Sequence, residues 1–323
     1  MILRVKKLKT WDGKRYYTLN YFLRERFGEK VFKIPLDAGF TCPNRDGAVS
    51  TGGCIFCSER GSGDFTGKSD DLVKQFYEAK EMMNRKWKEG KYIAYFQAYT
   101  NTYAGTEELR SKYYSIIEME GVVGLAIATR PDCLPDDVLE LLDEINKKVY
   151  LWVELGLQTI HEETAREINR GYRLEAYINA VKELKRRRID TVTHVILGLP
   201  GESRKQMVET VDFVANTDTQ GIKLHLLHVL KNTKLNEVYF KGRLLQMSRE
   251  EYADLIVDCI ERLPESMVVH RITGDGPRDT LVAPVWSLKK WEVLNAIDYQ
   301  FMDRSTWQGK KYIRNPDIGA LFE

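Results

Sequence analysis

Residues 40–57 read FTCPNRDGAVSTGGCIFC and place three of the five cysteines of this 323-residue chain in one loop. The spacing is Cys42-x11-Cys54-x2-Cys57, and the long spacer is rich in Gly, Pro, Asn and Asp, which favour turns. A Cys-x2-Cys turn chelates zinc or an iron–sulfur cluster. The loop therefore predicts a metal centre near the start of the chain.

Zinc and an iron–sulfur cluster differ in the number of protein ligands that they need. Structural zinc normally takes four, and no fourth Cys or His lies near the loop. A four-iron cluster held by three thiolates leaves one iron open to an outside ligand. Cys133 and Cys259 are the only other thiols, too few for a second cluster. Together with the rest of the chain, the pattern favours an iron–sulfur cluster over zinc and over three unrelated buried cysteines.

Around and after the loop, strand-like segments alternate with helix-period segments, which is typical of a βα array with a parallel sheet. The expected strands are residues 31–36, 92–97, 123–129, 149–157, 191–199, 222–229 and 268–272. The expected helices are residues 72–87 (opening at Ser69), 107–119, 135–145, 174–187 and 204–215, with another behind the capping box Ser248-x2-Glu251. Six or more βα units predict an α/β fold, a full or partial barrel with its chemistry at the carboxyl ends of the strands.

Polar residues gather at four of these strand ends, in residues 95–102, 129–132, 154–159 and 194–202. Glu154 lies in an otherwise apolar strand, where a lone carboxylate is costly unless it meets a ligand or a partner such as Arg130. His194 could instead be a core histidine with its hydrogen bonds satisfied. Four such ends in succession, on the face that carries barrel chemistry, favour one cofactor site.

Composition narrows the class of protein. Hydrophobic residues make up 43% and charged residues 30%, and the mean hydropathy is −0.41. No apolar stretch approaches the roughly 18–20 residues that a membrane span requires. The N-terminus has no apolar segment typical of a signal peptide. A soluble, cytoplasmic protein is expected, with no membrane partner.

The first 33 residues carry ten lysines and arginines against three acidic residues, interleaved with seven aromatic residues. Such a segment suits a polyanion with exposed bases, because cations meet phosphates while rings stack on bases. The alternative is a solvated arm whose aromatic side chains pack onto the core. Composition alone leaves these two interpretations about equal.

The motifs TCPNRDG…GGCIFC, YFQAYTNTYA, TRPDCLPDDVL, ELGLQT, NRGY and HVILGLPGE resemble those of the radical S-adenosylmethionine (SAM) superfamily, in its YhcC/YtqA-type branch. The x11 spacer departs from the usual x3 and is similar to the branch that includes the elongator catalytic subunit. The resemblance covers residues 31–272. It implies a partial (βα)6-type barrel over 31–275 with its cluster loop at 37–57, a basic-aromatic extension at 1–30 and a C-terminal extension at 276–323.

The resemblance also implies cofactors and their residues. Cys42, Cys54 and Cys57 would ligate a [4Fe–4S] cluster whose fourth iron is chelated by SAM. One electron, from a donor such as flavodoxin or ferredoxin, would then cleave SAM to methionine and a 5′-deoxyadenosyl radical. The implied SAM-binding residues are Phe56, Gln97, Ala98, Tyr99, Arg130, Glu154, Gln158, Ile196, Leu197 and Gly198.

The sequence indicates the substrate less directly than it indicates the cofactors. Candidates for catalytic groups are Lys223, His225, Arg271 and Asp275, while Arg278 and Trp286 are candidates for substrate contacts. Strand alternation predicts His225 and His228 on opposite faces, so that one of them is structural.

Both the resemblance and the basic segment indicate tRNA, rather than DNA, as a partner. The implied reaction converts a carboxymethylaminomethyl group at position 5 of a wobble uridine to aminomethyl. Two alternatives stay open, a radical SAM enzyme acting on a porphyrin-like small molecule and a non-catalytic iron–sulfur or cofactor-binding protein.

Overall fold

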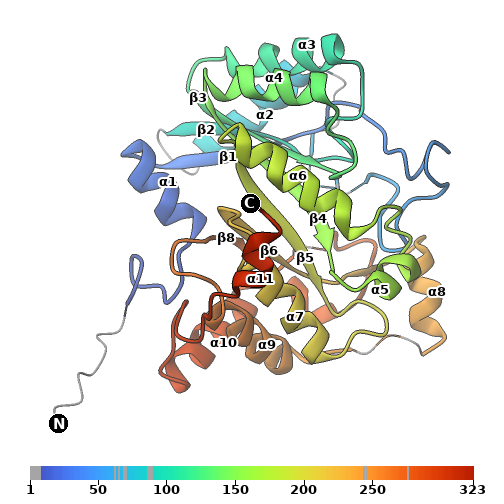
Figure 1. Cartoon of the computed structure of the whole chain (residues 1–323), viewed down its shortest axis with the longest axis vertical. Helices are drawn as coiled ribbons and strands as arrows, with labels where there is room; N and C mark the ends of the chain where they lie inside the picture. Colours follow the sequence, from blue (N-terminus) through green and yellow to red (C-terminus); the bar gives the residue numbers. More distant parts are fainter. Residues whose placement is uncertain are drawn as a thin grey trace.

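The computed structural model describes residues 9–61, 63, 64, 66, 67, 71–85, 90–242, 244, 246–274 and 276–323. Seven parallel strands form one curled sheet in the order β1-β2-β3-β4-β5-β6-β8 (Figure 1). Their bounds are β1 Val31–Leu36, β2 Lys91–Phe96, β3 Val122–Thr129, β4 Tyr150–Gln158, β5 Asp190–Leu197, β6 Gly221–Leu226 and β8 Val268–Arg271. Because β1 and β8 stand at opposite edges of this order, the sheet is a half-barrel, which confirms the predicted partial barrel.

Helices cover the outer face of the half-barrel (Figure 1). They are α2 Leu72–Asn84, α3 Thr106–Ile117, α4 Asp136–Asn146, α6 Leu174–Arg186, α7 Arg204–Val214 and α9 Arg249–Glu261. Leu142, Leu184 and Leu224 belong to the apolar core between these helices and the sheet, and all three are fully buried. None of the described helices is both long and apolar enough to cross a membrane.

Several expected boundaries differ from the observed ones, and two of the differences change the local structure. The side chain of Asp71, not Ser69, caps α2 by accepting hydrogen bonds from the backbone N–H groups of Val73 and Lys74; Ser69 itself lies outside the described residues. The expected strand over 222–229 is also wrong at its end, because β6 stops at Leu226. A separate strand, β7 (Val229–Leu230), pairs antiparallel with β9 (Leu281–Ala283).

A short helix closes the amino end of the half-barrel. It is α1, Leu19–Phe27, capped by Thr18, which pairs with Val269 of β8. Leu23 is 4% exposed and belongs to a cluster with the inward-facing residues Val31, Ile93 and Trp152. Leu19, Phe22 and Phe27 of α1 pack against this cluster, so this end of the half-barrel is a packed apolar core.

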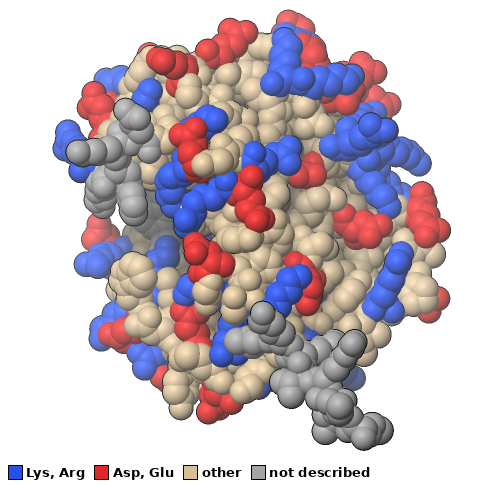
Figure 2. Space-filling view, turned by 90° about the vertical axis from the view of Figure 1, so that its left-hand side faces the viewer, with Lys and Arg blue, Asp and Glu red and all other residues tan. Residues whose placement is uncertain are grey.

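Several charges of the described N-terminal segment are ion-paired. Lys9 contacts Glu265 at 2.5 Å, Arg24 contacts Asp12 at 2.8 Å, and Lys14 pairs with Asp298. The described aromatic residues pack as well: Trp11 and Tyr16 are buried, and Phe22 and Phe27 lie 6.0 and 6.1 Å from the ring of Tyr150. Figure 2 shows acidic and basic side chains interspersed on the side of the molecule that carries α1. For residues 9–33, the structure therefore supports the packing interpretation.

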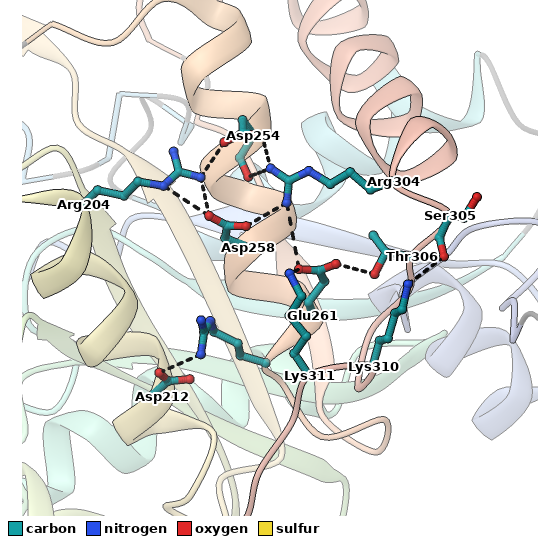
Figure 3. A network of polar contacts seen from close by, with 11 residues as sticks. Arg204, Asp212, Asp254, Asp258, Glu261, Arg304, Ser305, Thr306, Lys310 and Lys311 are labelled. Carbon is teal, nitrogen blue, oxygen red and sulfur yellow. Dashed lines mark hydrogen bonds and ion pairs between the residues drawn. The ribbon is translucent and has the colours of Figure 1, made fainter. Parts of the chain in front are cut away.

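The C-terminal segment docks on the barrel helices. The remaining elements are α5 Glu162–Glu167, α8 Lys234–Phe240, the 3-10 helix Val285–Leu288, α10 Lys290–Asp303 and α11 Pro316–Ala320. In Figure 3, Arg204 of α7 and Arg304 after α10 both bind Asp254 and Asp258 of α9. The nearby carboxylate of Glu261 is 2% exposed and pairs with Lys311 at 2.5 Å. These shared partners fix α10 against α7 and α9.

Candidate active site

Two adjoining cavities open at the carboxyl end of the half-barrel. The first, of about 180 Å³, is lined by Cys42, Cys54 and Cys57 together with side chains from several strand ends, and we call it the cysteine cavity. The second, of about 190 Å³, is lined by His194, His225 and His228, and we call it the histidine cavity. Both cavities are lined by Phe56, Gln97, Gln158, His194, His225 and Arg271. The predicted grouping of polar strand ends around one site is thus present.

Backbone hydrogen bonds hold the cysteine loop in place. The N–H of Ile55 donates to the carbonyl of Ile168 at 3.1 Å, and the N–H of Leu235 donates to the carbonyl of Ile55 at 2.8 Å. Ile55 itself is 8% exposed and packs in an apolar cluster with Leu199 and Leu227. The segment between the last two cysteines is therefore anchored to the end of α5 and the start of α8.

The motifs TCPNRDG and NRGY contact each other. Asn44 is fully buried and donates through Nδ2 to the carbonyl of Asn169 at 2.6 Å and to the sulfur of Cys54 at 3.6 Å. Asn169 in turn donates to the carbonyl of Gly53 at 2.8 Å. Gly171 has φ +81°, and a Cβ there would lie 2.5 Å from Oδ1 of Asn44. The glycine thus permits the close approach that locks the two motifs together.

The three thiols suit a bound cluster. All three are free and partly exposed. Burial, and next the neighbouring Cys57 thiolate, raise the pKa of Cys54 to about 12, while Arg130 opposes this rise. Among the described residues, no three His, Cys, Asp or Glu side chains converge closely enough for a single metal ion. Three thiols around a cavity, one with an amide N–H directed at its sulfur, match a larger cationic group that would favour the thiolate form.

Arg130 has partners other than the predicted Glu154. Its guanidinium makes a bidentate pair with Asp132 at 2.9 and 2.7 Å and donates to the carbonyl of Arg170 at 2.9 Å. The guanidinium carbons of Arg130 and Arg170 each lie 4.7 Å from the centre of the Tyr172 ring. The ring is thereby held in the wall of the cysteine cavity between two cations.

Glu154 lies at the centre of a buried ionic cluster. Its carboxylate is fully buried; Oε1 accepts from Trp152 at 2.9 Å, and Oε2 lies 2.9 Å from Nε2 of His194 and pairs with Lys223. Burial alone would raise the pKa of Glu154. Lys223 and then Lys33 lower it by more than burial raises it, so the pKa is well below the ordinary value. Glu154 is therefore ionised and bonded within the wall of the cysteine cavity.

Sequence reasoning missed Lys33 and Tyr95. Nζ of Lys33 lies 3.6 Å from Oε1 of Glu154 and 4.0 Å from the centre of the Tyr95 ring. Nζ of Lys223 donates to the hydroxyl of Tyr95 at 3.1 Å. Lys33 breaks the apolar run of β1 just as Glu154 breaks that of β4, and this signal could have found it.

Two cavity residues have left-handed backbones. Tyr99 has φ 59° and Gln158 has φ 67°, and residues other than glycine rarely adopt such backbone conformations. The register of β4 against β5 also shifts between Gly156 and Gln158, as in a β-bulge. Such bulges re-aim side chains at the rims of barrels. This geometry accounts for Gln158 reaching both cavities at the end of its strand.

The other predicted residues divide by place. Tyr99, Arg130, Glu154 and Lys223 line the cysteine cavity, and Ile196 lines the histidine cavity. Ala98, Leu197 and Gly198 line neither: the first two are fully buried, and Gly198 lies in a small recess beside Met247. Asp275 lies outside the described residues. Trp286 donates to the carbonyl of Met247 at 3.0 Å and packs on Tyr252, and Arg278 is exposed.

The prediction that His225 and His228 lie on opposite faces is wrong. Because β6 ends at Leu226, the strand alternation stops before His228, and both histidines line the histidine cavity. Burial and then Arg271 lower the pKa of His225 well below the ordinary value. Its imidazole is therefore neutral at pH 7.

Comparison with known proteins gives consistent matches. The Radical SAM superfamily domain matches residues 45–214, and the Radical_SAM C-terminal domain matches residues 219–303. The uncharacterized protein YtqA of Bacillus subtilis is 54% identical over 309 residues, 95% of this chain and 96% of its own. Protein YhcC of Escherichia coli is 38% identical over 277 residues, 85% of this chain and 89% of its own.

A solved structure agrees with the fold. The archaeal Methanocaldococcus infernus Elp3, with an N-terminal deletion, superposes with a TM-score of 0.64 at 18% sequence identity. The match covers 86% of this chain, which spans 64% of that structure. At this identity, the likeness concerns the fold.

Proposed function

The chain belongs to the radical SAM superfamily, and from this premise we propose that it modifies a tRNA wobble uridine. Enzymes of this superfamily use a [4Fe–4S] cluster with SAM, which together supply a 5′-deoxyadenosyl radical. The proposed reaction converts a carboxymethylaminomethyl group at position 5 of the base to aminomethyl. The 5′-deoxyadenosyl radical would take a hydrogen atom from the carboxymethyl carbon, loss of one electron would give an imine, and hydrolysis would release glyoxylate; SAM is the net oxidant, because the electron lost replaces the one that cleaved it. The observation that carries the proposal is the meeting of the three cysteines with polar strand ends around one cavity.

The residues of the cysteine cavity have distinct proposed tasks. Cys42, Cys54 and Cys57 hold the cluster, and the amide of Asn44 stabilises the Cys54 thiolate by its hydrogen bond. Gln97 and Gln158, which line both cavities, would contact the polar groups of SAM. Phe56, Tyr99 and Tyr172 supply an aromatic wall that keeps water from the reacting carbon.

The tRNA part of the proposal depends on the resemblance of the motifs to the YhcC/YtqA-type branch. The N-terminal segment lends it less support than its composition indicated, because Lys9, Lys14 and Arg24 are ion-paired. The nucleobase would reach the cavities from the carboxyl ends of the strands, where the cysteine loop and the loops after β4 and β6 surround the opening.

The test measures SAM cleavage under anaerobic conditions. The cluster is reconstituted, dithionite and SAM are added, and 5′-deoxyadenosine is quantified with tRNA that carries carboxymethylaminomethyluridine or lacks it. We expect the modified tRNA to stimulate 5′-deoxyadenosine formation and to yield aminomethyluridine. Equal 5′-deoxyadenosine from both tRNAs would contradict the proposed substrate.

Matched cysteine variants test the cluster site. Cys54→Ala should lose cluster iron and all 5′-deoxyadenosine formation, since it removes a proposed ligand. Cys259→Ala is the control, because Cys259 is fully buried in α9 against the apolar core, away from both cavities. If Cys54→Ala bound as much iron as Cys259→Ala, the cysteine assignment would be wrong. An intact cluster with no SAM cleavage would instead support a non-catalytic protein.

A further inference from the structure

Several cationic side chains gather in the interior of the half-barrel. Among the described residues, Lys33 of β1 and Lys223 of β6 both pair with Glu154, and Arg271 of β8 lies close enough to affect the pKa of both lysines. Burial, with Arg271 contributing, lowers the pKa of both lysines. An anionic ligand bound beside these cationic side chains would be stabilised by them.

The histidine cavity places one of these cations beside an incomplete hydrogen-bonding group. Arg271 lines the cavity together with His225. Nε2 of His225 is buried and has no hydrogen-bond partner among the described residues. A neutral imidazole can carry its proton on Nε2 and donate it, and a guanidinium offers a fork of N–H donors. The pair is therefore suited to an anion with two oxygen acceptors.

We propose that Arg271 and His225 bind the carboxylate of the substrate's carboxymethylaminomethyl group in the histidine cavity. The identity of this group rests on the proposed function, whereas the anion site rests on the charges and on the unsatisfied histidine nitrogen. The cavity adjoins the cysteine cavity through six shared residues, so a carboxylate held there would leave the neighbouring methylene near the boundary of the two.

Other groups of the cavity are compatible with this assignment. Asp64 is the acidic residue among its described lining; it accepts from the hydroxyl of Ser58 at 3.0 Å and comes from the loop after the cysteines. Lys223 is engaged with Glu154 and Tyr95 and is 2% exposed, so it contributes charge from beneath the site. Arg271 and His225 are among the six residues that line both cavities.

The test compares a carboxylate with its neutral amide. The holoprotein with oxidised cluster and saturating SAM, without reductant, is titrated with an anticodon stem-loop RNA bearing carboxymethylaminomethyluridine or the corresponding carboxamide. Saturating SAM ensures that its own carboxylate is already bound. We expect the carboxylate RNA to bind roughly 30-fold tighter or more than the amide, the effect typical of a buried charged hydrogen bond. Equal affinities for the two RNAs in the parent protein would overturn the proposal.

Substitutions test whether Arg271 and His225 cause the preference for the carboxylate RNA. Arg271→Gln should reduce the preference for the carboxylate to within a few-fold, His225→Gln should reduce it in part, and Arg271→Lys should restore part of it. Arg314→Gln removes the same charge at an exposed position outside both cavities and should keep the full preference. A full preference in Arg271→Gln would overturn the assignment, and His225→Gln provides the same test if Arg271→Gln does not fold.

The two proposals can fail separately. If the carboxylate RNA is preferred but is not processed after reduction, the anion site stands and the proposed reaction is wrong. If the RNA is processed without any preference over its amide, the proposed reaction stands and the carboxylate site is wrong.

Discussion

At the amino end of the half-barrel, Phe22 and Phe27 pack on Tyr150, and Arg24 pairs with Asp12. At the carboxyl end, Tyr172 and Arg130 lie in the wall of a cavity. Both ends combine aromatic rings with arginines. They differ in what surrounds those residues, which is the apolar face of a regular helix at one end and irregular loops with left-handed residues at the other.

The difference teaches that residue types alone do not reveal a binding surface. A regular helix such as α1 satisfies its own backbone and presents one apolar face, so its rings are covered. Loops such as the cysteine loop leave polar groups directed inward, toward space that a ligand can fill. A basic-aromatic segment such as α1 can therefore serve to pack one end of the half-barrel. A binding site, in contrast, can be built from residues that lie on many different strands.

The largest effect is expected from Glu154→Ala, which tests whether the carboxyl half depends on its buried carboxylate. Removing it leaves Lys33, Lys223 and His194 without their shared partner, and breaking such a buried cluster costs about 3–5 kcal/mol. Urea denaturation of the apoprotein gives the free energy of unfolding. Glu154→Gln, which keeps an acceptor for Trp152, should lose less. A loss below about 1 kcal/mol in Glu154→Ala would show that the cluster is not coupled to stability.

At the amino end, Leu23→Ala should destabilise without disturbing the site. Leu23 of α1 is 4% exposed and packs in the apolar cluster at this end of the half-barrel, and truncating a buried leucine costs about 2–4 kcal/mol. The free energy of unfolding should fall by this amount, while the 5′-deoxyadenosine formed per bound iron should stay at the parent's value. A fall in activity per iron would mean that the two ends are coupled, and the comparison would then break down.

The carboxyl end should be sensitive to acid. Burial and then Lys223 lower the pKa of His194 from 6.5 to about 4. The unfolded chain therefore takes up this proton at a higher pH than the native protein does. The stabilisation is fully present above pH 6.5 and is lost as the pH falls toward about 4, by on the order of 2–3 kcal/mol. His194→Asn should make the free energy of unfolding depend less on pH over this range. An unchanged slope against pH would show that other groups cause the acid sensitivity.

The smallest effect is expected from Arg24→Gln in α1. Its ion pair with Asp12 is exposed to solvent, and such pairs contribute little to stability. The unfolding free energy should stay within experimental error of the parent's, and so should the affinity for tRNA measured by filter binding at a fixed salt concentration. A clear loss of tRNA affinity would reinstate the N-terminal segment as an RNA-binding surface.

Much of the fold could be predicted because buried parallel strands read as apolar runs. β1 matches its expected bounds in full, and β3 differs by one residue. The end of β6 could not be predicted, because residues 222–229 contain no Gly, Pro, Asn or Asp that would mark the turn before Val229. The packing of α1 inside the half-barrel could not be predicted either, since it depends on contacts with strands far along the chain.

The candidate site was predictable where a residue conflicts with its surroundings. The cysteine loop and Glu154 stand out in the sequence, and both line the cysteine cavity. The partner of Glu154 did not follow, because Lys223 comes 69 residues later and only the curl of the sheet brings them together. Arg130 finds Asp132, two residues away, and is thereby unavailable to Glu154.

The contact of α1 with β8 has a consequence for the order of folding. β8 is made about 240 residues after α1, a delay of roughly 12–50 s at ordinary rates of translation. Until then the side chain of Leu23 can pack on β1–β5, which carry its apolar cluster, but Thr18 has no β8 to pair with. The amino end of the half-barrel can therefore begin to pack early in synthesis, and it is completed only when the last strand of the sheet has been made.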